Sequence, residues 1–204
     1  MFTITDDDGN VSTVEEPSPD YTYTYADYLK WKFEERLELF KGRIYKMSGP
    51  NTKHQMVAGN MYLKMRHALD NYKCNVFIAP YDIRLPVRNR KNDNEITTVV
   101  QPDLCIVCDE TKIDERGVCG APDLIVEILS PGNSKKEVRI KFELYEEAGV
   151  KEYWLVNPVE ENLIIYTLDA TQKFGGGKMY AGGDIIISSG VTGLRIEVSE
   201  IFKK

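Results

Sequence analysis

The sequence predicts a single α/β or α+β domain in which a mixed β-sheet is flanked by two or three helices. Its 204 residues fit one domain. Apolar residues make up 42% of the chain and charged residues 28%, so there is enough apolar material for a core without structural disulfides or metal. Stretches with helical and with strand-like spacing are interspersed along the chain, which favours a mixed architecture.

The N-terminal segment differs in composition from the rest of the chain. Residues 1–20 are acidic and contain Ser and Pro, which predicts an N-terminal arm. We therefore expect the folded domain to comprise residues 21–204.

Three stretches have the spacing or the end signals of helices. The longest carries apolar residues such as Val57, Met61 and Met65 on one stripe. The other two begin with an approximate capping box, and Gly149 suits the C-terminal cap of the last one. The predicted helices are 24–33, begun by Thr24-x-x-Asp27; 54–72; and 135–148, begun by Ser134-x-x-Glu137.

Strand-like runs occupy much of the remaining chain. Lys41-Gly42 separates two of them, and glycine at the second turn position favours a tight hairpin. The predicted strands are 36–40, 43–47, 75–79, 81–87, 98–100, 104–108, 124–129, 153–156, 163–168, 184–188 and 194–198.

Four cysteines occur, and two of them form the pair Cys105-x-x-Cys108. The pair lies in a predicted strand, where residues three apart point to opposite faces and cannot easily share a metal. Because free cysteines are usually buried, we predict buried, reduced thiols.

The chain has a net charge of -6 and a pI near 5.1. This balance counts against a nucleic-acid coat protein, but a nuclease can combine a local basic groove with an acidic remainder. The N-terminus shows no basic region followed by an apolar run, and no apolar stretch approaches the roughly 20 residues that span a bilayer. We therefore expect a cytoplasmic protein that does not enter a membrane.

Two carboxylates stand in apolar surroundings. Asp103 begins an apolar run, and Glu127 lies between Val126 and Ile128 inside another. A strand that is apolar on both sides is normally buried on both faces, and a buried carboxylate needs a partner or a metal. Asp103 and Glu127 on neighbouring strands would suit Mg2+, which prefers oxygen ligands.

A lysine on the last predicted helix could complete this pair. Lys141 lies along the stripe formed by Val138, Phe142 and Tyr145, and could reach over the end of the sheet toward the carboxylates. A lysine beside a metal can orient or activate a water molecule. Two carboxylates, a metal and a lysine together favour phosphodiester hydrolysis.

Structural roles remain open for each of these residues. Asp103 could simply start a strand, Glu127 could form a structural salt bridge, and Lys141 could extend its charged end into solvent. Other polar residues also have two interpretations. Glu38 could be functional or could face solvent, and His54 could be functional or could have a capping or polar surface role. The basic side chains could contact phosphates or could belong to a solvated loop; these are Arg84, Arg88, Arg90 and Lys91.

The order of motifs resembles the Uma-two family of restriction-endonuclease-like proteins, within the PD-(D/E)xK nuclease superfamily. The resemblance covers about residues 24–202. The pieces that carry it are Leu37-Glu38-Leu39-x-x-Gly42-x-Ile44, His54, Gln101-Pro102-Asp103-Leu104, Ala121-Pro122-Asp123-Leu124-Ile125-Val126-Glu127-Ile128-Leu129-Ser130-Pro131, and Lys141-x3-Tyr145-x3-Gly149-Val150-x-Glu152-Tyr153-Trp154-Leu155-Val156.

This resemblance implies a restriction-endonuclease-like core, with a central mixed sheet, flanking helices and extra strands at both ends. The superfamily lysine would fall at Leu129, and Lys141 on the following helix matches the position that this family uses instead. A Mg2+-dependent endonuclease, with Mn2+ as an alternative ion, acting on DNA as a homodimer, is the implied activity. The implied site comprises catalytic Asp103, Glu127, Lys141 and Glu38; metal ligands Asp103, Glu127 and Ile128; and nucleic-acid-binding His54 and Arg84.

Two other functions remain open. A catalytically silent nucleic-acid-binding or interaction module could retain the same fold, with the charged residues occupied by salt bridges. An RNA-directed accessory nuclease is not distinguished from a deoxyribonuclease by the sequence.

Overall fold

A computed structural model describes residues 2–5, 11–14, 21–30, 36–47, 49–86, 92–130 and 135–203. Within them the helices are α1 (Tyr25–Tyr28), α2 (Thr52–Ala68), α3 (Lys135–Ala148) and α4 (Val198–Ile201), with a 3-10 turn η2 (Glu110–Lys112). No helix in these ranges is long and apolar enough to cross a membrane.

The central sheet is mixed, as the sequence predicts. Its order is β14-β13-β12-β11-β8-β5, in which β11 and β12 are parallel and are joined through α3, while the other pairs are antiparallel. Its strands are β5 (Asn75–Ile78), β8 (Leu104–Val107), β11 (Leu124–Ile128), β12 (Glu152–Asn157), β13 (Asn162–Thr167) and β14 (Lys178–Ala181).

A second sheet has the order β4-β3-β7-β6-β10-β9, and two strand pairs stand apart from both large sheets. The second sheet comprises β3 (Leu37–Phe40), β4 (Arg43–Lys46), β6 (Ile83–Arg84), β7 (Val99–Val100), β9 (Ile113–Asp114) and β10 (Gly117–Cys119). The separate pairs are β1 (Phe2–Thr5) with β2 (Val11–Val14), and β15 (Ile185–Ile187) with β16 (Arg195–Glu197).

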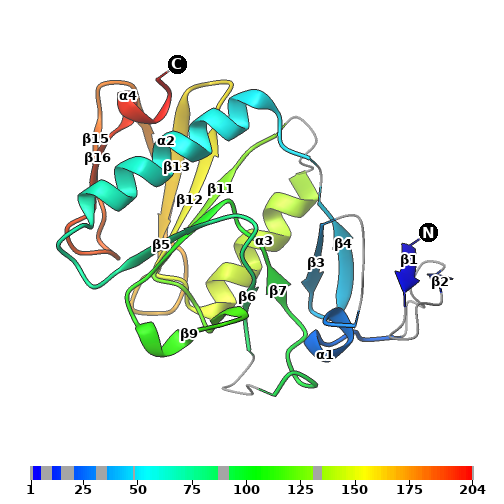
Figure 1. Cartoon of the computed structure of the whole chain (residues 1–204). Coiled ribbons are helices and arrows are strands. Elements are labelled where there is room, and N and C mark those ends of the chain that lie inside the picture. The colour runs from blue at the N-terminus through cyan, green and yellow to red at the C-terminus, as the bar shows by residue number, and fades with distance from the viewer. Residues whose placement is uncertain are drawn as a thin grey trace.

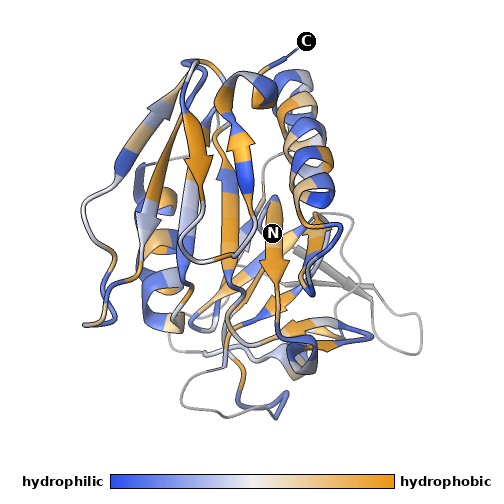
Figure 2. Cartoon of the chain, turned by 90° about the vertical axis from the view of Figure 1, so that its left-hand side faces the viewer, coloured by the Kyte–Doolittle hydropathy of each residue, from blue (hydrophilic) through white to orange (hydrophobic). Residues whose placement is uncertain are grey.

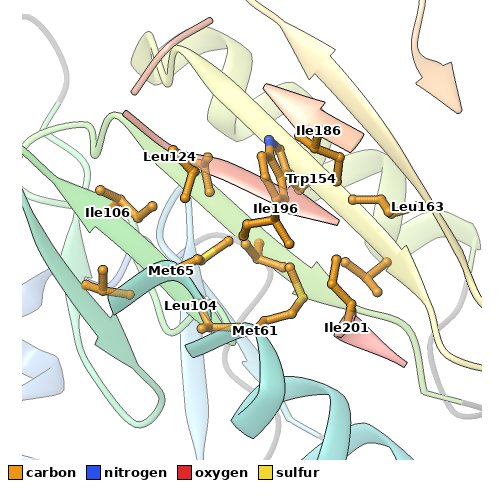
Figure 3. Close-up of a cluster of buried hydrophobic side chains, with 14 of the residues drawn as sticks. Met61, Met65, Leu104, Ile106, Leu124, Trp154, Leu163, Ile186, Ile196 and Ile201 are labelled. Carbon is orange, nitrogen blue, oxygen red and sulfur yellow. The ribbon is translucent and has the colours of Figure 1, made fainter. Parts of the chain in front are cut away.

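The two faces of the central sheet are covered by different elements (Figure 1). On one face, α2 packs through Met61 and Met65 against side chains such as Trp154, together with β16 and α4. Figure 3 shows this layer, in which the labelled side chains are all apolar. On the other face, Tyr145 of α3 and strands of the second sheet pack against Ile125 and its neighbours. Figure 2 shows mostly hydrophobic central strands beside helices of mixed hydropathy.

Two of the three predicted helices match the structure closely. Helix α3 has the predicted bounds, and Gly149 ends it with a φ of 83°. The amide of Val150 donates to the Tyr145 carbonyl, so the end is a Schellman motif. Ser134, the predicted cap residue, lies outside the described residues. Helix α2 begins two residues earlier than predicted because the Asn51 side chain caps it, and it ends at Ala68, four residues earlier than predicted.

The first predicted helix is shorter than expected. Thr24 and Asp27 form the predicted capping box, but α1 ends at Tyr28. Residues 31–33 of the predicted span lie outside the described residues.

The predicted hairpin is present as β3 and β4. Lys41 and Gly42 have φ values of 48° and 78°, which is the backbone of a type I′ turn. A Cβ at Gly42 would lie 2.3 Å from the Thr22 side chain, so the turn needs glycine for space as well as for conformation. The hairpin fixes the position of Glu38 on β3.

Several short elements were not predicted. Strands β9, β10 and β14 and helix α4 span two to four residues each. Within residues 81–86 of the predicted strand 81–87, only the two residues of β6 form a strand, and residue 87 lies outside the described residues. These segments are too short to show a period in the sequence. Their pairing depends on partners distant along the chain, as in the parallel contact of β10 with β6.

The prediction of reduced cysteines is wrong for two of the four. Cys74 and Cys108 form a disulfide, because β5 and β8 are antiparallel and their pairing continues directly from Asn75 opposite Val107. The spacing within the C-x-x-C pair could not predict this disulfide, because the other cysteine, Cys74, lies directly before another strand. Cys105 is a buried free thiol as predicted, and burial raises its pKa to about 12.

Candidate active site

A small polar cavity lies at one end of the central sheet. Strand β8 begins where the antiparallel strand β11 ends, so Asp103 and Glu127 are brought to the same end. In Figure 1 the start of α2, the start of α3 and the β3–β4 hairpin gather at this side of the molecule. The cavity has a volume of about 50 Å³, and its described lining is Arg36, Met47, Pro50, His54, Asp103, Glu127, Ile128, Ser130, Glu137 and Lys141.

Glu127 points to the α3 side of the sheet and is held there by two side chains. Lys141 Nζ lies 2.9 and 3.1 Å from its two oxygens, and the Tyr145 hydroxyl donates to Oε1 at 2.5 Å. Burial, with further contributions from Asp103 and Glu38, raises the pKa of Glu127 to about 7, although Lys141 opposes the rise. The carboxyl therefore changes charge near neutral pH.

Lys141 is 5% exposed and contacts two carboxylates. Besides Glu127, it lies 3.1 Å from Glu38 Oε1. Burial alone would lower the pKa of Lys141, but the two neighbouring negative charges raise it. The amine therefore remains a cation, and it sits inside the protein instead of extending into solvent.

Glu38 is buried, at 2% exposure, so it does not face solvent as one interpretation of the sequence allowed. Its Oε1 accepts a hydrogen bond from the Gln101 amide at 2.9 Å and also faces Lys141. Glu38 thus connects the hairpin to α3 and fixes the position of the lysine.

Asp103 is held by one main-chain donor and by one histidine. The Ile128 amide donates to Oδ2 at 2.7 Å, and His54 Nε2 lies 3.2 Å from Oδ1. Burial lowers the pKa of His54, but the hydrogen bond and charge of Asp103 raise it above its ordinary value overall. Its Nδ1 has no hydrogen-bond partner among the described residues.

Ile128 contributes to this site through its main chain. Its side chain packs in the apolar layer under α2, and its amide binds Asp103. The main-chain oxygen, not the side chain, is the group that could act as the predicted ligand.

The prediction that Arg84 binds nucleic acid is wrong. Arg84 is 2% exposed, and its Nη2 lies 2.6 Å from Asp114 Oδ1. Its guanidinium also lies over the Tyr25 ring, 5.3 Å from the centroid. It belongs to β6, which runs between β7 and β10 in the second sheet, so the side chain is enclosed. Arg88, Arg90 and Lys91 lie outside the described residues.

Two residues of the cavity region were missed as functional candidates. Tyr145 was assigned only to the apolar stripe of α3, and Arg36 only to a strand. The spacing carried a signal for each: Tyr145 is one helical turn after Lys141, and Arg36 is two residues before Glu38.

Few side chains at the cavity could bind a metal ion. Throughout the described ranges, no three His, Cys, Asp or Glu side chains are grouped so that they could hold one ion. Asp103, Glu127 and Glu137 are the carboxylates among the described lining of the cavity, and of these Asp103 contacts His54 and Glu127 contacts Lys141. Any ion here would therefore need main-chain oxygen or water to complete its ligands.

The protein has a mixed sheet flanked by helices, and two carboxylates and a lysine meet at one end of that sheet. This arrangement agrees with a nuclease-like fold. The chain belongs to the Uma2 family, described as "Putative restriction endonuclease", whose model matches residues 25–199. This assignment confirms the resemblance drawn from the motifs.

Two individual proteins are similar to this chain. The crystal structure of a protein from Anabaena variabilis, described as "a putative nuclease belonging to DUF820", has a TM-score of 0.70 and 18% identity. The match covers 88% of this chain and 97% of that one, and at this identity it concerns the fold alone. An uncharacterized protein from Synechocystis sp. is 27% identical over 143 residues, which are 69% of this chain and 71% of its own length.

Proposed function

We propose that the protein is a metal-dependent nuclease that hydrolyses phosphodiester bonds, with DNA as its substrate. The observation that supports this most is the meeting of Asp103, Glu127 and Lys141 at one small polar cavity. Charged groups taken out of water cost folding free energy that an apolar cluster would not, so their presence here favours a functional reason.

The donors at the cavity fit Mg2+ or Mn2+. Carboxylate oxygens of Asp103 and Glu127, with the main-chain oxygen of Ile128, would hold the ion. These are hard oxygen ligands, and Mg2+ usually keeps several waters of its own. The volume of about 50 Å³ has room for such waters, since each needs roughly 10–15 Å³. A bound ion would acidify a water molecule and stabilise the charge that develops on the phosphate.

Lys141 supplies the positive side chain of the proposed reaction. Its contacts with Glu127 and Glu38 keep the amine protonated and fix its position. From there its positive charge would stabilise the negative charge that develops on the phosphate. Glu38 acts through Lys141, so we assign it a positioning role.

His54 and Tyr145 would orient the two carboxylates. His54 contacts Asp103 Oδ1, and the Tyr145 hydroxyl contacts Glu127 Oε1. Each contact leaves the second oxygen of its carboxylate to other partners. His54 also lines the cavity. Its contact with nucleic acid therefore stays a prediction.

DNA is proposed as the substrate because the family is described as "Putative restriction endonuclease". The choice of DNA over RNA, the homodimer and the cytoplasmic location stay predictions.

One observation favours the silent module as a second candidate. Asp103, Glu127 and Lys141 each already have protein partners at hydrogen-bond distance. If those contacts are the whole purpose of the residues, the protein binds no metal and cuts nothing.

Cleavage of plasmid and single-stranded DNA tests the proposal directly. The purified protein is assayed with Mg2+ or Mn2+ beside Asp103→Asn, Glu127→Gln and the exposed control Glu160→Gln. We expect metal-dependent cutting that the first two substitutions abolish and the control retains. Circular dichroism would establish that all variants are folded.

Two results would count against the proposal. No cutting by the wild type with either metal favours the silent module. Cutting that persists in both Asp103→Asn and Glu127→Gln would place the chemistry elsewhere.

A further inference from the structure

The basic side chains around the cavity differ in how strongly the protein engages them. Lys141 is buried between Glu127 and Glu38, and His54 is buried against Asp103. Arg36 also lines the cavity, but its side chain is exposed. No ion pair of its guanidinium is found within the part of the chain that the structure describes.

The hairpin holds the backbone of Arg36 in place. Arg36 precedes β3 and lies opposite Met47, whose amide donates to the Arg36 carbonyl at 3.0 Å. Met47 lines the same cavity. Because residues two apart on a strand point to the same side, Arg36 is directed to the side on which Glu38 meets Lys141. Its backbone is therefore held, while its exposed side chain lines the cavity.

The charge of the cavity creates a need for such a group. Asp103, Glu127 and Glu137 line it, and Glu38 lies behind Lys141, so carboxylates outnumber the buried cation. A phosphodiester carries its own negative charge and would be repelled by this set. A divalent ion relieves part of the repulsion, but Lys141 is already engaged by two carboxylates.

We propose that Arg36 is a substrate-binding residue that holds a non-bridging phosphate oxygen of a nucleic acid strand at the mouth of the cavity. The proposal deepens the nuclease function and rests on it. An arginine suits the role, because its planar fork can donate two parallel hydrogen bonds to one phosphate. An exposed arginine also gives up little on binding, since it breaks no ion pair with any residue that the structure describes.

Binding of a labelled oligonucleotide tests this assignment without any cleavage. Anisotropy is measured with Ca2+ in place of Mg2+, for the wild type, Arg36→Ala and Arg36→Lys. Arg43→Ala is the matched control, because Arg43 is exposed on the same hairpin and instead contacts the Tyr21 carbonyl. All four proteins are compared at several salt concentrations.

We expect Arg36→Ala to weaken binding about tenfold, and Arg36→Lys to recover part of the loss. Removing one phosphate contact should also lower the slope of log K against log salt by about 0.7 to 0.9. A merely structural role would not change that slope. With cleavable substrate, KM should rise more than kcat falls.

Each outcome bears on the two proposals separately. Binding and salt slope in Arg36→Ala that equal those of Arg43→Ala would overturn the role of Arg36, whether or not DNA is cut. Binding that depends on Arg36 in a protein that never cuts would support the role of Arg36 and reject the nuclease function. A wild type that binds no oligonucleotide would overturn both.

Discussion

Glu127 and Glu152 are two largely buried carboxylates on neighbouring parallel strands, and they are partnered in opposite ways. Glu152, at 1% exposure, accepts five hydrogen bonds, all from neutral donors. These come from the Trp154 ring, the Ser188 hydroxyl, the Ser189 amide and hydroxyl, and the Gly190 amide. Glu127 instead faces a cation, a tyrosine hydroxyl and a polar cavity.

The contrast separates a carboxylate whose partners all belong to the fold from one that we propose to be functional. The donors around Glu152 come from the loop after β15 and from β12 itself, so this residue ties the two segments together. Its oxygens are fully used by the fold. Glu127 has fewer donors and shares its surroundings with Asp103 and Lys141. The two glutamates are therefore distinguished by the chemistry of their hydrogen-bond partners and not by burial alone.

The largest effect is expected for activity. Glu127→Gln should lower metal-dependent cleavage by about 10³-fold or more, because the amide is a poor metal ligand. Glu152→Gln should leave the cleavage rate of the folded protein within about threefold. Turnover is measured with Mn2+ under saturating DNA. Equal losses in the two variants would remove the distinction between the carboxylates.

The largest effect on stability is expected at the other carboxylate. Glu152→Ala should lower the free energy of unfolding by about 3 kcal/mol or more, because several buried donors lose their acceptor. Urea unfolding followed by tryptophan fluorescence measures this. A loss below about 1 kcal/mol would mean that water replaces the carboxylate at little cost.

A smaller effect is expected at the tyrosine that contacts Glu127. Tyr145→Phe should destabilise the protein by about 1.5 kcal/mol, because it removes a hydrogen bond to a charged group. Tyr153→Phe is the matched control, since its buried hydroxyl has no partner within the described ranges. That variant should be neutral or slightly stabilising. A control that loses as much as Tyr145→Phe would indicate a packing effect in both.

A further effect is expected in the pH dependence of stability without metal. Burial raises the folded-state pKa of Glu127 from its ordinary value of 4.5 to about 7. The folded protein then binds more protons than the unfolded chain between these values, so stability falls as pH rises through this window. Glu127→Gln should flatten this fall in urea titrations at pH 5 to 8. An unchanged slope would assign the fall to other groups.

The sequence was informative where local patterns decided the structure. The bounds of α3, the turn at Lys41 and Gly42, and the capping box of α1 follow from residue types and short spacings. Glu127 could be singled out because a carboxylate inside an apolar run needs a partner. The position of Lys141 on the α3 stripe indicated that this lysine could be the partner.

The remaining features depend on contacts between distant parts of the chain. Arg84 was taken for an exposed residue, but pairing of β6 on both sides encloses it beside Asp114. The Cys74–Cys108 disulfide follows from the register of β5 and β8. Glu38 was recognised from the motif, but its burial depends on a helix about a hundred residues later.

Binding of Mn2+ to the protein, followed by electron paramagnetic resonance, tests the central claim most directly. The wild type, Asp103→Asn, Glu127→Gln and Glu152→Gln are titrated at pH 8, above the pKa of about 7 of the Glu127 carboxyl. We predict one bound ion in the wild type and in Glu152→Gln, and greatly weakened binding in the other two. Equal binding by all four proteins, or none by the wild type, would contradict the assignment of Asp103 and Glu127 as a metal site.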